Sequence, residues 1–531
     1  MFKKSQNVSA LFSKYLYPTD STTEAKIDEA IIGTVLNSST DTPYLLVVAD
    51  DKKMNGRMEK LLAAAENLNT VGIVVITTAE KINRAYRRRF GGDGWDEIQD
   101  IEYFQPARQL EYGRRRPALP LSKELEGIFF EIHSVMRDVD GIHPDEALEE
   151  LCKLLYTRSY EEEVAKERGA LVLRSENFGS TEEHAASIRG FYREASEYDM
   201  RVFRLKIPQY ERSRGVFNRP IRLSSAALVK CYKMLEEYDL SKTQTDIKGR
   251  AFQKVLGKTI RSGMGQYFTP NPVCELMTAI IVPKVSDLIL DPFCGSGHFL
   301  TECLRSVASV QGRTSKAFHE FAFGKLHGIE KSERMVRIAM TDMRLNGDGH
   351  SNIRCTDALL DFANYPDISP DSFDIVITNP PFGSLLGSEA LTGLGHYELA
   401  RNKKNSPLEI LGLERSIQFL RPGGKLAIVL PDNVLSSDST QFVRSWLLQH
   451  ILPRIIVSLP VDTFCPYGAN VKTGILFAKK MKPGEKPNDS KTVCMIQVTN
   501  VGYDASGREL RGMDLDAAAE EASRFLQREG W

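Results

Sequence analysis

A polar amide, two prolines and an aromatic ring stand together at Asn379-Pro380-Pro381-Phe382, directly after the apolar run 373–378. Proline has no amide hydrogen and fixes the backbone around it. The local polar groups are therefore acceptors, namely the side-chain oxygen of Asn379 and the carbonyl of Pro380. Two adjacent acceptors suit an –NH2 group. The pattern predicts a site that holds an amino group, and a plain Pro-Pro turn with a surface aromatic is the alternative.

An amino nitrogen held in this way directs its lone pair at an electrophile. Methyl transfer to it is an in-line displacement, helped by positioning and by acceptors that stabilise the developing positive charge. No nucleophilic side chain is needed, and Phe382 would stack on a base taken out of its helix. The four residues resemble the catalytic motif of amino-methyltransferases that act on DNA adenine. The same motif also serves glutamine amides and amines in RNA.

A second cluster lies at 291–297, DPFCGSG, between an apolar run and a helical stretch. Gly295 and Gly297 permit a tight strand-to-helix turn, and the amides of a helix start attract polar or anionic groups. The spacing matches neither a phosphate-binding loop nor a dinucleotide fingerprint, and a plain turn is the alternative. With Asp291 and Phe293 ahead of the glycines, the run resembles the first motif of S-adenosyl-L-methionine-dependent amino-methyltransferases. In those enzymes the motif surrounds the methionine part of the cofactor.

Two further carboxylates follow predicted strands. Glu330 ends the strand after the cofactor loop, and its carboxylate can accept hydrogen bonds from both hydroxyls of a ribose. Asp357 follows the next strand, where it could accept from the exocyclic amine of the cofactor's adenine. Each residue also suits the N-cap of a following helical turn, so both interpretations stay open.

Short apolar runs of strand type alternate with helical stretches from residue 263 onward. The alternation predicts an α/β fold with a Rossmann-like, doubly wound and largely parallel sheet of seven strands. Such a sheet binds ligands at the carboxyl ends of its strands, which is where both clusters fall. The predicted strands are 288–290, 326–329, 352–355, 373–378, 425–430, 454–459 and 473–478.

The remainder of the chain divides by its apolar pattern. Two β-type runs, 44–49 and 72–78, flank a helical 58–65 and predict a small α/β domain at the N-terminus. Helical spacing alone predicts a helical domain after it. The predicted regions are 1–112 (small α/β domain), 118–262 (helical domain), 263–480 (sheet domain) and 481–531 (tail with a helix).

Several more motifs surround the two clusters, at 246–253, 263–270, 430–435, 456–464 and 471–477. Together they resemble the methylation subunit of type I restriction-modification systems, which are gamma-class N6-adenine DNA methyltransferases. The likeness runs from about residue 120 to 530. It implies site-specific adenine-N6 methylation within a restriction-modification or related phage-defence complex. It also implies that Gln266, Tyr267, Phe268, Thr269 and Pro270 cover the cofactor's methionine end, with Tyr267 where the family usually has phenylalanine.

The resemblance implies partners as well. The family's methylation subunit lacks a target-recognition domain, so we expect a separate specificity subunit to read the double-stranded DNA, with a restriction or helicase subunit as a further partner. Lysine plus arginine (69) and aspartate plus glutamate (70) nearly cancel, which fits this division because no global positive field draws the chain to DNA. The alternatives are methylation of RNA or of a protein glutamine, and a non-catalytic DNA-binding scaffold.

The region before the resemblance holds Asp50-Asp51-Lys52, which with Glu24 faintly resembles the metal-binding strand of restriction nucleases. An ordinary strand-to-turn exit is the alternative, and a degenerate nuclease fold used for docking is our preferred interpretation. Candidate phosphate contacts are the basic clusters at 87–89, 114–116 and 401–404, with solvated faces as the alternative. The last cluster lies in the segment 383–405, a candidate loop for closing over DNA.

The eight cysteines are scattered and include no C-x-x-C pair, so we expect reduced thiols and no metal site in the catalytic region. No segment reaches the roughly 18 apolar residues of a membrane span. The sequence therefore predicts a cytoplasmic protein without membrane contact.

Overall fold

The computed structural model describes the elements of two compact units, residues 1–116 with 164–177, and residues 117–163 with 178–531. The described residues are 31–34, 45–49, 73–77, 82–88, 95–98, 122–168, 171–206, 219–240, 243, 245–261, 268–313, 315–347, 352–387, 391, 394, 396–401, 403–485 and 492–531.

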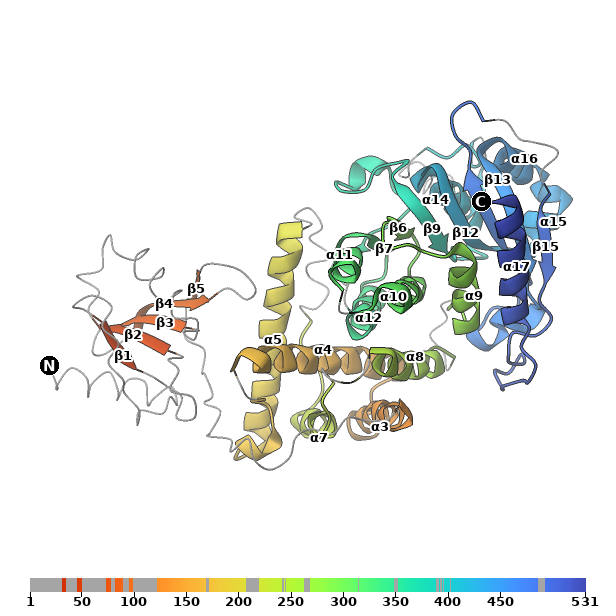
Figure 1. Ribbon diagram of the computed structural model, residues 1–531. Coiled ribbons are helices and arrows are strands. Elements are labelled where there is room, and N and C mark those ends of the chain that lie inside the picture. The colour runs from red at the N-terminus through yellow and green to blue at the C-terminus, as the bar shows by residue number, and fades with distance from the viewer. Residues whose placement is uncertain are drawn as a thin grey trace. The chain divides into compact units, whose positions relative to one another are not determined.

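The N-terminal unit contains a five-stranded sheet in the order β1-β2-β3-β4-β5 (Figure 1). Its central pair, β2 and β3, is parallel, and the other neighbours are antiparallel. Both predicted β-type runs are therefore strands of one mixed sheet. The predicted helix at 58–65 and the residues Glu24, Asp50, Asp51 and Lys52 lie outside the described residues. The strands are Ile31–Thr34, Leu45–Ala49, Ile73–Thr77, Ile82–Arg88 and Trp95–Ile98.

The stretch after this sheet is helical, as the apolar spacing predicted. Apolar residues of these helices are largely buried, including Phe129, Leu151 and Tyr232. Ser224 caps α7 by accepting a hydrogen bond from the Ala227 amide, in the usual manner of a serine N-cap. The helices are α3 (Ser122–Asp140), α4 (Pro144–Arg168), α5 (Thr181–Lys206), α7 (Ser225–Glu236) and α8 (Thr245–Arg261).

The larger sheet has eight strands in the order β15-β13-β14-β12-β9-β6-β7-β8. All seven predicted strands are present, and the eighth, β15, was not predicted. Neighbours are parallel except around β14, which runs antiparallel to both β12 and β13. The strands are β6 (Ile289–Asp291), β7 (Leu326–Glu330), β8 (Ile353–Cys355), β9 (Phe373–Thr378), β12 (Leu420–Pro431), β13 (Ile451–Ser458), β14 (Thr473–Lys480) and β15 (Cys494–Gln497).

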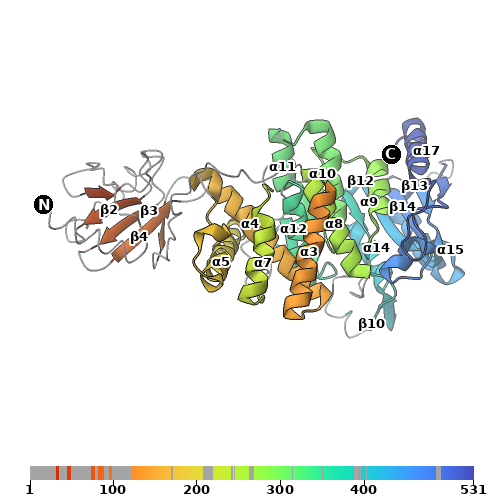
Figure 2. The same cartoon turned by 90° about the horizontal axis from the view of Figure 1, so that it is seen from below.

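Helices cover this sheet as its doubly wound pattern requires (Figures 1 and 2). A short two-stranded ribbon, β10 with β11, was not predicted and interrupts the pattern after β9. None of the helices in the described part of the chain is both long and apolar enough to cross a membrane. These elements are α9 (Asn271–Ile281), α10 (His298–Gln311), α11 (Lys316–Gly324), α12 (Glu333–Leu345), α14 (Leu408–Phe419), α15 (Asp432–Ser436), α16 (Gln441–His450), α17 (Leu515–Glu529), β10 (Leu385–Gly387) and β11 (Asn405–Pro407).

The order of the strands decides where the site lies. From β6 the chain moves outward through β7 and β8, and then returns to the other side of β6 with β9. Such a switch point leaves a crevice beyond the carboxyl ends of the two central strands. Because Leu290 pairs with Val376, Asp291 at the end of β6 and Asn379 just after β9 face the same crevice.

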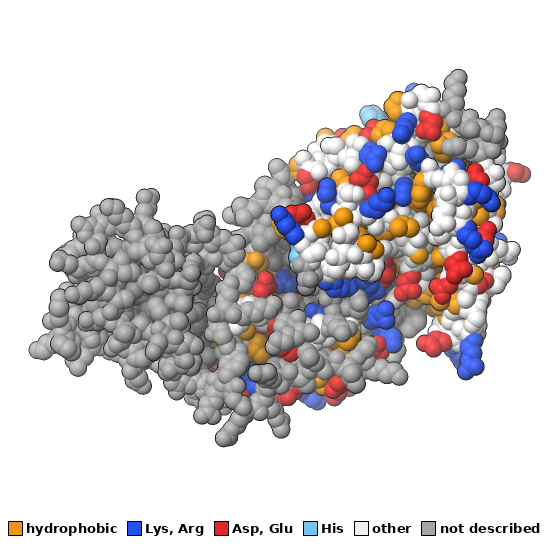
Figure 3. Space-filling model, in the orientation of Figure 1, with side chains coloured by type: hydrophobic (Ala, Val, Ile, Leu, Met, Phe, Trp, Pro, Cys, Tyr) orange, Lys and Arg blue, Asp and Glu red, His pale blue; other side chains and the backbone are white. Residues whose placement is uncertain are grey.

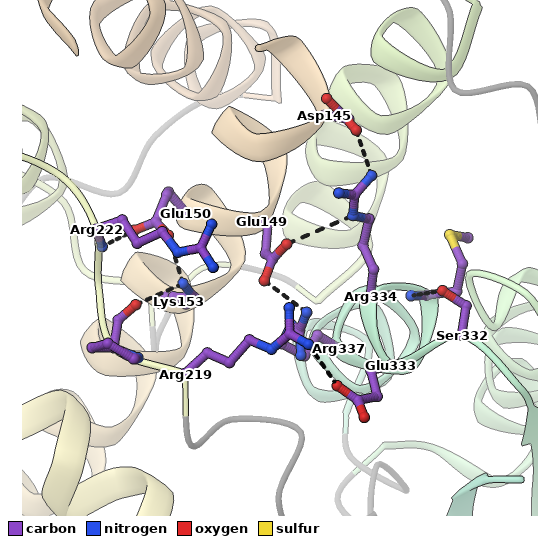
Figure 4. A network of polar contacts seen from close by, with 12 residues as sticks. Asp145, Glu149, Glu150, Lys153, Arg219, Arg222, Ser332, Glu333, Arg334 and Arg337 are labelled. Atoms are coloured by element: carbon purple, nitrogen blue, oxygen red, sulfur yellow. Dashed lines mark hydrogen bonds and ion pairs between the residues drawn. The ribbon is translucent and has the colours of Figure 1, made fainter. Parts of the chain in front are cut away.

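A polar network joins α12 of the sheet region to α4 of the helical stretch (Figure 4). Arg337 donates to Glu149 at 2.6 Å, and Arg334 lies between Glu149 and Asp145. Two turns further along α12, Arg344 donates to Ser159 and Glu163 at 3.1 and 3.0 Å. Hydrogen bonds between charged side chains are strong and require a specific geometry. The contacts at Arg334, Arg337 and Arg344 therefore hold α12 in one register against α4.

Candidate active site

A cavity of about 400 Å³ opens at the carboxyl ends of the central strands of the larger sheet. It brings together residues from both predicted clusters, although they lie far apart in sequence. Pro270 and Gly297 stand beside it as the N-caps of α9 and α10, and Gln266 and Tyr267 lie outside the described residues. The predicted residues that line it are Phe268, Thr269, Asp291, Phe293, Gly295, Glu330, Asp357, Asn379, Pro380, Pro381 and Phe382.

The glycines of the 291–297 loop are required by its backbone. Gly295 and Gly297 have φ angles of +51° and +80°, a conformation that residues with a side chain rarely adopt. A Cβ on Gly297 would also lie 3.2 Å from that of Ala339. The loop thus turns tightly from β6 into α10 and brings its backbone to the cavity wall.

Asp291 is fully buried at the end of β6. Its Oδ1 accepts hydrogen bonds from the Thr378 hydroxyl at 2.6 Å and from the Phe293 amide at 3.1 Å. Its Oδ2 has no hydrogen-bond partner among the described residues. Burial raises the pKa of Asp291 to about 7, because desolvation opposes the charged form more than these two bonds favour it. A positively charged ligand group beside Oδ2 would reverse that penalty.

Glu330 and Asp357 line the cavity with part of their hydrogen-bonding capacity already used. Glu330 accepts from the amides of Gly295 at 3.2 Å and Ser332 at 2.7 Å, and burial raises its pKa. Asp357 pairs with Lys331 at 2.8 Å and accepts from the Leu359 amide at 3.0 Å, so it does cap the turn that follows it. Each carboxylate oxygen can accept a second bond, which leaves room for ligand hydroxyls or amines.

Asn379 is held by a residue from a distant part of the chain. Its Nδ2 donates to the hydroxyl of Thr269 at 2.9 Å, which orients the side-chain amide. Its Oδ1 is buried, and no hydrogen-bond partner for it exists among the described residues. A buried acceptor is rarely left without a donor, so this oxygen is ready for an N–H of a ligand. The bond also gives a structural reason for the segment that contains Thr269, which on its residues alone is merely a turn.

Phe382 lines the cavity and is 3% exposed. Its ring centroid lies 6.2 Å from that of Phe464 at an interplanar angle of 81°, an edge-to-face contact that favours one ring orientation. Phe464 comes from the segment after β13, so the predicted motif at 456–464 reaches the site through this contact. Stacking of Phe382 on an extruded base stays a prediction.

The segment after the 379–382 motif is tied to the part of the cavity that contains Asp357. Arg415 of α14 is buried and donates to the carbonyls of Leu359 and Leu360 at 3.2 and 2.8 Å. Tyr397, from the segment 383–405, donates to the same Leu359 carbonyl at 2.8 Å. In the basic cluster of that segment, Lys403 lies 3.1 Å from the centre of the Phe442 ring. Part of this predicted loop is therefore anchored to the turn that carries Asp357.

A glycine on α14 makes room for the 379–382 motif. A Cβ on Gly412 would lie 2.8 Å from the Pro380 Cβ, closer than such atoms approach, and 3.1 Å from the Phe293 ring, which is also tight. Gly412→Ala should therefore displace Pro380 and lower about tenfold the rate of the methyl transfer that the sequence predicts at the 379–382 motif, because reacting groups tolerate little misplacement. Single-turnover transfer of a labelled methyl group measures the effect. Gly127→Ala is the matched control, since that helix position is open, and equal rates for both variants would contradict the prediction.

Several lining residues were not predicted, among them His298 and Lys331. Thr378, which was not predicted either, does not line the cavity but donates to Asp291 from behind its wall. His298 directly follows the recognised 291–297 motif, and its polar side chain at the start of the next helix was the available signal. Lys331 and Thr378 act through partners on neighbouring strands. Nothing in their local sequence reveals those contacts.

The switch-point cavity, the glycine loop at the end of β6 and the strand order define a Rossmann-like fold of the methyltransferase class. The chain belongs to the N-6 DNA methylase family, whose model matches residues 243–529. It is 31% identical over 261 residues to the Type I restriction enzyme EcoEI methylase subunit of Escherichia coli, covering 47% of this chain and 50% of the relative. It is 31% identical over 231 residues to the EcoKI methylase subunit of Escherichia coli K12, covering 41% of each chain.

Solved structures agree on the fold. A chain from a structural study of complex assembly in the type I R-M system has a TM-score of 0.57 at 20% identity, covering 77% of this chain and 83% of that chain. The type I restriction-modification methyltransferase subunit of Streptococcus thermophilus has a TM-score of 0.54 at 16% identity, covering 76% and 94%. The predicted resemblance to type I methylation subunits is thus confirmed. The chain spans about half the length of the curated relatives it matches, or less.

Proposed function

We propose that this protein transfers a methyl group from S-adenosyl-L-methionine to the N6 amino group of adenine in double-stranded DNA. The main support for this proposal is the Oδ1 of Asn379, which is buried and has no hydrogen-bond partner among the described residues. It lies at the wall of a cavity that residues of the 291–297 loop also line. An acceptor in that position suits an amino group, whereas a hydroxyl or thiol nucleophile would also require a base, which a side-chain amide does not supply. Membership of the N-6 DNA methylase family supports DNA adenine as the substrate.

The residues present fit the cofactor. Asp291 offers a free carboxylate oxygen for the ammonium group, and Glu330 and Asp357, which line the same cavity, would accept from the ribose and from the adenine amine. Phe293, Gly295 and Gly297 shape the loop around the methionine part, and Gln266 to Pro270 would cover it. When bound, S-adenosyl-L-methionine supplies a methyl group on a positively charged sulfur.

The chain's own part in the reaction is to hold the amino group. Asn379 Oδ1 and the Pro380 carbonyl would accept hydrogen bonds from its two N–H groups, which leaves its lone pair free to attack a methyl group. These acceptors stabilise the positive charge that develops on nitrogen during the displacement. Pro381 keeps the backbone from rotating out of this geometry, and Phe382 stacks on the extruded adenine.

We infer that the protein acts as the modification subunit of a restriction-modification or related phage-defence complex in the cytoplasm. On the face drawn in Figure 3, basic and acidic side chains of the described residues are interspersed. Strong binding to DNA depends on many phosphate contacts. A separate specificity subunit would supply them together with the base contacts, and a restriction or helicase subunit is a further partner.

The test is methyl incorporation. The full chain is incubated with labelled cofactor and genomic DNA, alone and with the proteins encoded beside it. We expect label in N6-methyladenine when the specificity partner is present. Label in RNA or in protein glutamine would redirect the proposal to those substrates, and no incorporation under any pairing would overturn it.

A further inference from the structure

His298 is the first residue of α10 and lines the same cavity as Asp291 and Asn379. Its side chain is 4% exposed, and neither ring nitrogen has a hydrogen-bond partner among the described residues. Oε1 of Glu302 is 3.9 Å from Nε2, beyond hydrogen-bonding distance. Buried polar groups are otherwise bonded in proteins, so an imidazole in this position indicates a ligand group that completes it.

The chemical form of this imidazole limits what it can bind. Burial, and to a lesser extent the nearby Arg305, lower the pKa of His298 to about 3. The ring is therefore neutral near pH 7, with one N–H donor and one acceptor nitrogen. Phe268 lies against it with ring centroids 5.4 Å apart, which limits the orientations of the ring. His298 thus offers a fixed donor without a positive charge.

The surroundings of His298 favour a carboxylate. The first amides of a long helix have no partners within the helix and carry a partial positive charge, and His298 stands at that end of α10. The cavity also presents the free Oδ2 of Asp291, which can only accept while it is ionised. A buried acceptor and a buried donor beside a helix start match the ammonium and the carboxylate of an α-amino acid.

Resting on the proposed use of S-adenosyl-L-methionine, we propose that His298 donates a hydrogen bond to the carboxylate of that cofactor's amino-acid end. His298 is then a positioning residue that selects ligands with an intact amino-acid group. The ring nitrogen, the helix amides and Asp291 together recognise both charges of the amino acid. The adenosine part is recognised elsewhere, by Glu330 and Asp357.

Ligand truncation tests this role without any need for turnover. Binding to the full chain is measured by calorimetry with S-adenosylhomocysteine, with decarboxylated S-adenosylmethionine and with 5′-methylthioadenosine, which lacks the amino-acid end. His298→Phe should weaken S-adenosylhomocysteine about tenfold, the usual effect of losing a bond to a charged group. It should leave the other two ligands within about twofold, since the contact in question is absent from them. His298→Gln, which retains a donor, should recover most of the loss, and His319→Phe on the exposed face of α11 should change nothing.

Each other outcome overturns the assignment. An equal loss for all three ligands would mean that His298 only supports the shape of the cavity. A loss shared by the decarboxylated ligand would mean that His298 acts on the ammonium side, and no loss for any ligand would mean that it contacts none of them. If the unchanged protein binds none of the three, the proposed cofactor is wrong and not only the role of His298. Retained binding of 5′-methylthioadenosine shows that a variant is folded.

Discussion

Replacing Asn379 by alanine is expected to lower the rate of methyl transfer by about a thousandfold, the upper effect of removing one preorganised hydrogen-bonding group from a transition state. The substitution removes the buried Oδ1 that would accept from the amino group, and with it half of the acceptor pair. Cofactor binding should change little, because Asp291 and Glu330 are untouched. Single-turnover transfer into DNA, measured with the specificity partner present, gives the rate, and calorimetry gives cofactor binding.

Substitutions of Thr269 test whether the orientation of the Asn379 side-chain amide matters for the rate. Thr269→Ala keeps the Asn379 oxygen but removes the hydroxyl that receives its Nδ2 at 2.9 Å, so the amide can rotate and the rate should fall about tenfold. Thr269→Ser keeps the hydroxyl and should restore the rate. If Asn379→Ala transfers methyl groups as fast as the unchanged protein, the acceptor role of Asn379 is wrong.

Glu149→Ala should destabilise the protein by about 3 kcal/mol, as expected when one partner of a largely buried ion pair is removed. Glu149 lies between Arg334 and Arg337, and the Arg337 side chain is 1% exposed. The loss of this carboxylate leaves positive charge in a region that water reaches poorly. The free energy of unfolding, measured in urea, reports the effect.

A surface ion pair is the matched comparison. Glu320 pairs with Lys316 at 3.6 Å, where the two side chains are 68% and 90% exposed. Glu320→Ala should change the free energy of unfolding by less than about 0.5 kcal/mol, because exposed pairs are weak. If the two variants prove equally stable, α12 is not held by the network of Figure 4.

Local pattern was sufficient for most of the larger sheet. Seven strands were predicted because each is a short apolar run between helical stretches, and both clusters fell at the predicted carboxyl ends. The eighth strand was missed because Cys494–Gln497 alternates half-buried and exposed residues, with Met495 70% exposed. Such an edge strand is defined by its pairing with β13 rather than by its own composition. The ribbon of β10 and β11 was missed for a similar reason, since its pairing joins segments about twenty residues apart.

The sequence predicted those site residues whose side chain is unusual for its position. It did not predict contacts between residues that are far apart in the chain. Asn379, Asp291 and Glu330 stand out in sequence because each is polar at the end of an apolar strand. The contact between Asn379 and Thr269 spans 110 positions, and no local pattern encodes it. The space that Gly412 leaves for Pro380 is equally invisible, because an isolated glycine in a helix has many possible causes.

The arginines of α12 also decide whether the catalytic region can exist alone. A fragment that begins after residue 262 would retain Arg337 and Arg344 but lose Glu149 and Glu163, which come from α4. It would also lose Gln253 of α8, which donates to the buried Asp342 at 3.2 Å. Without these partners, charged side chains of α12 that are buried in the whole protein would be left unpaired, so the fragment should not fold independently. The helical stretch and the sheet therefore have to be inherited, exchanged or engineered as a single piece.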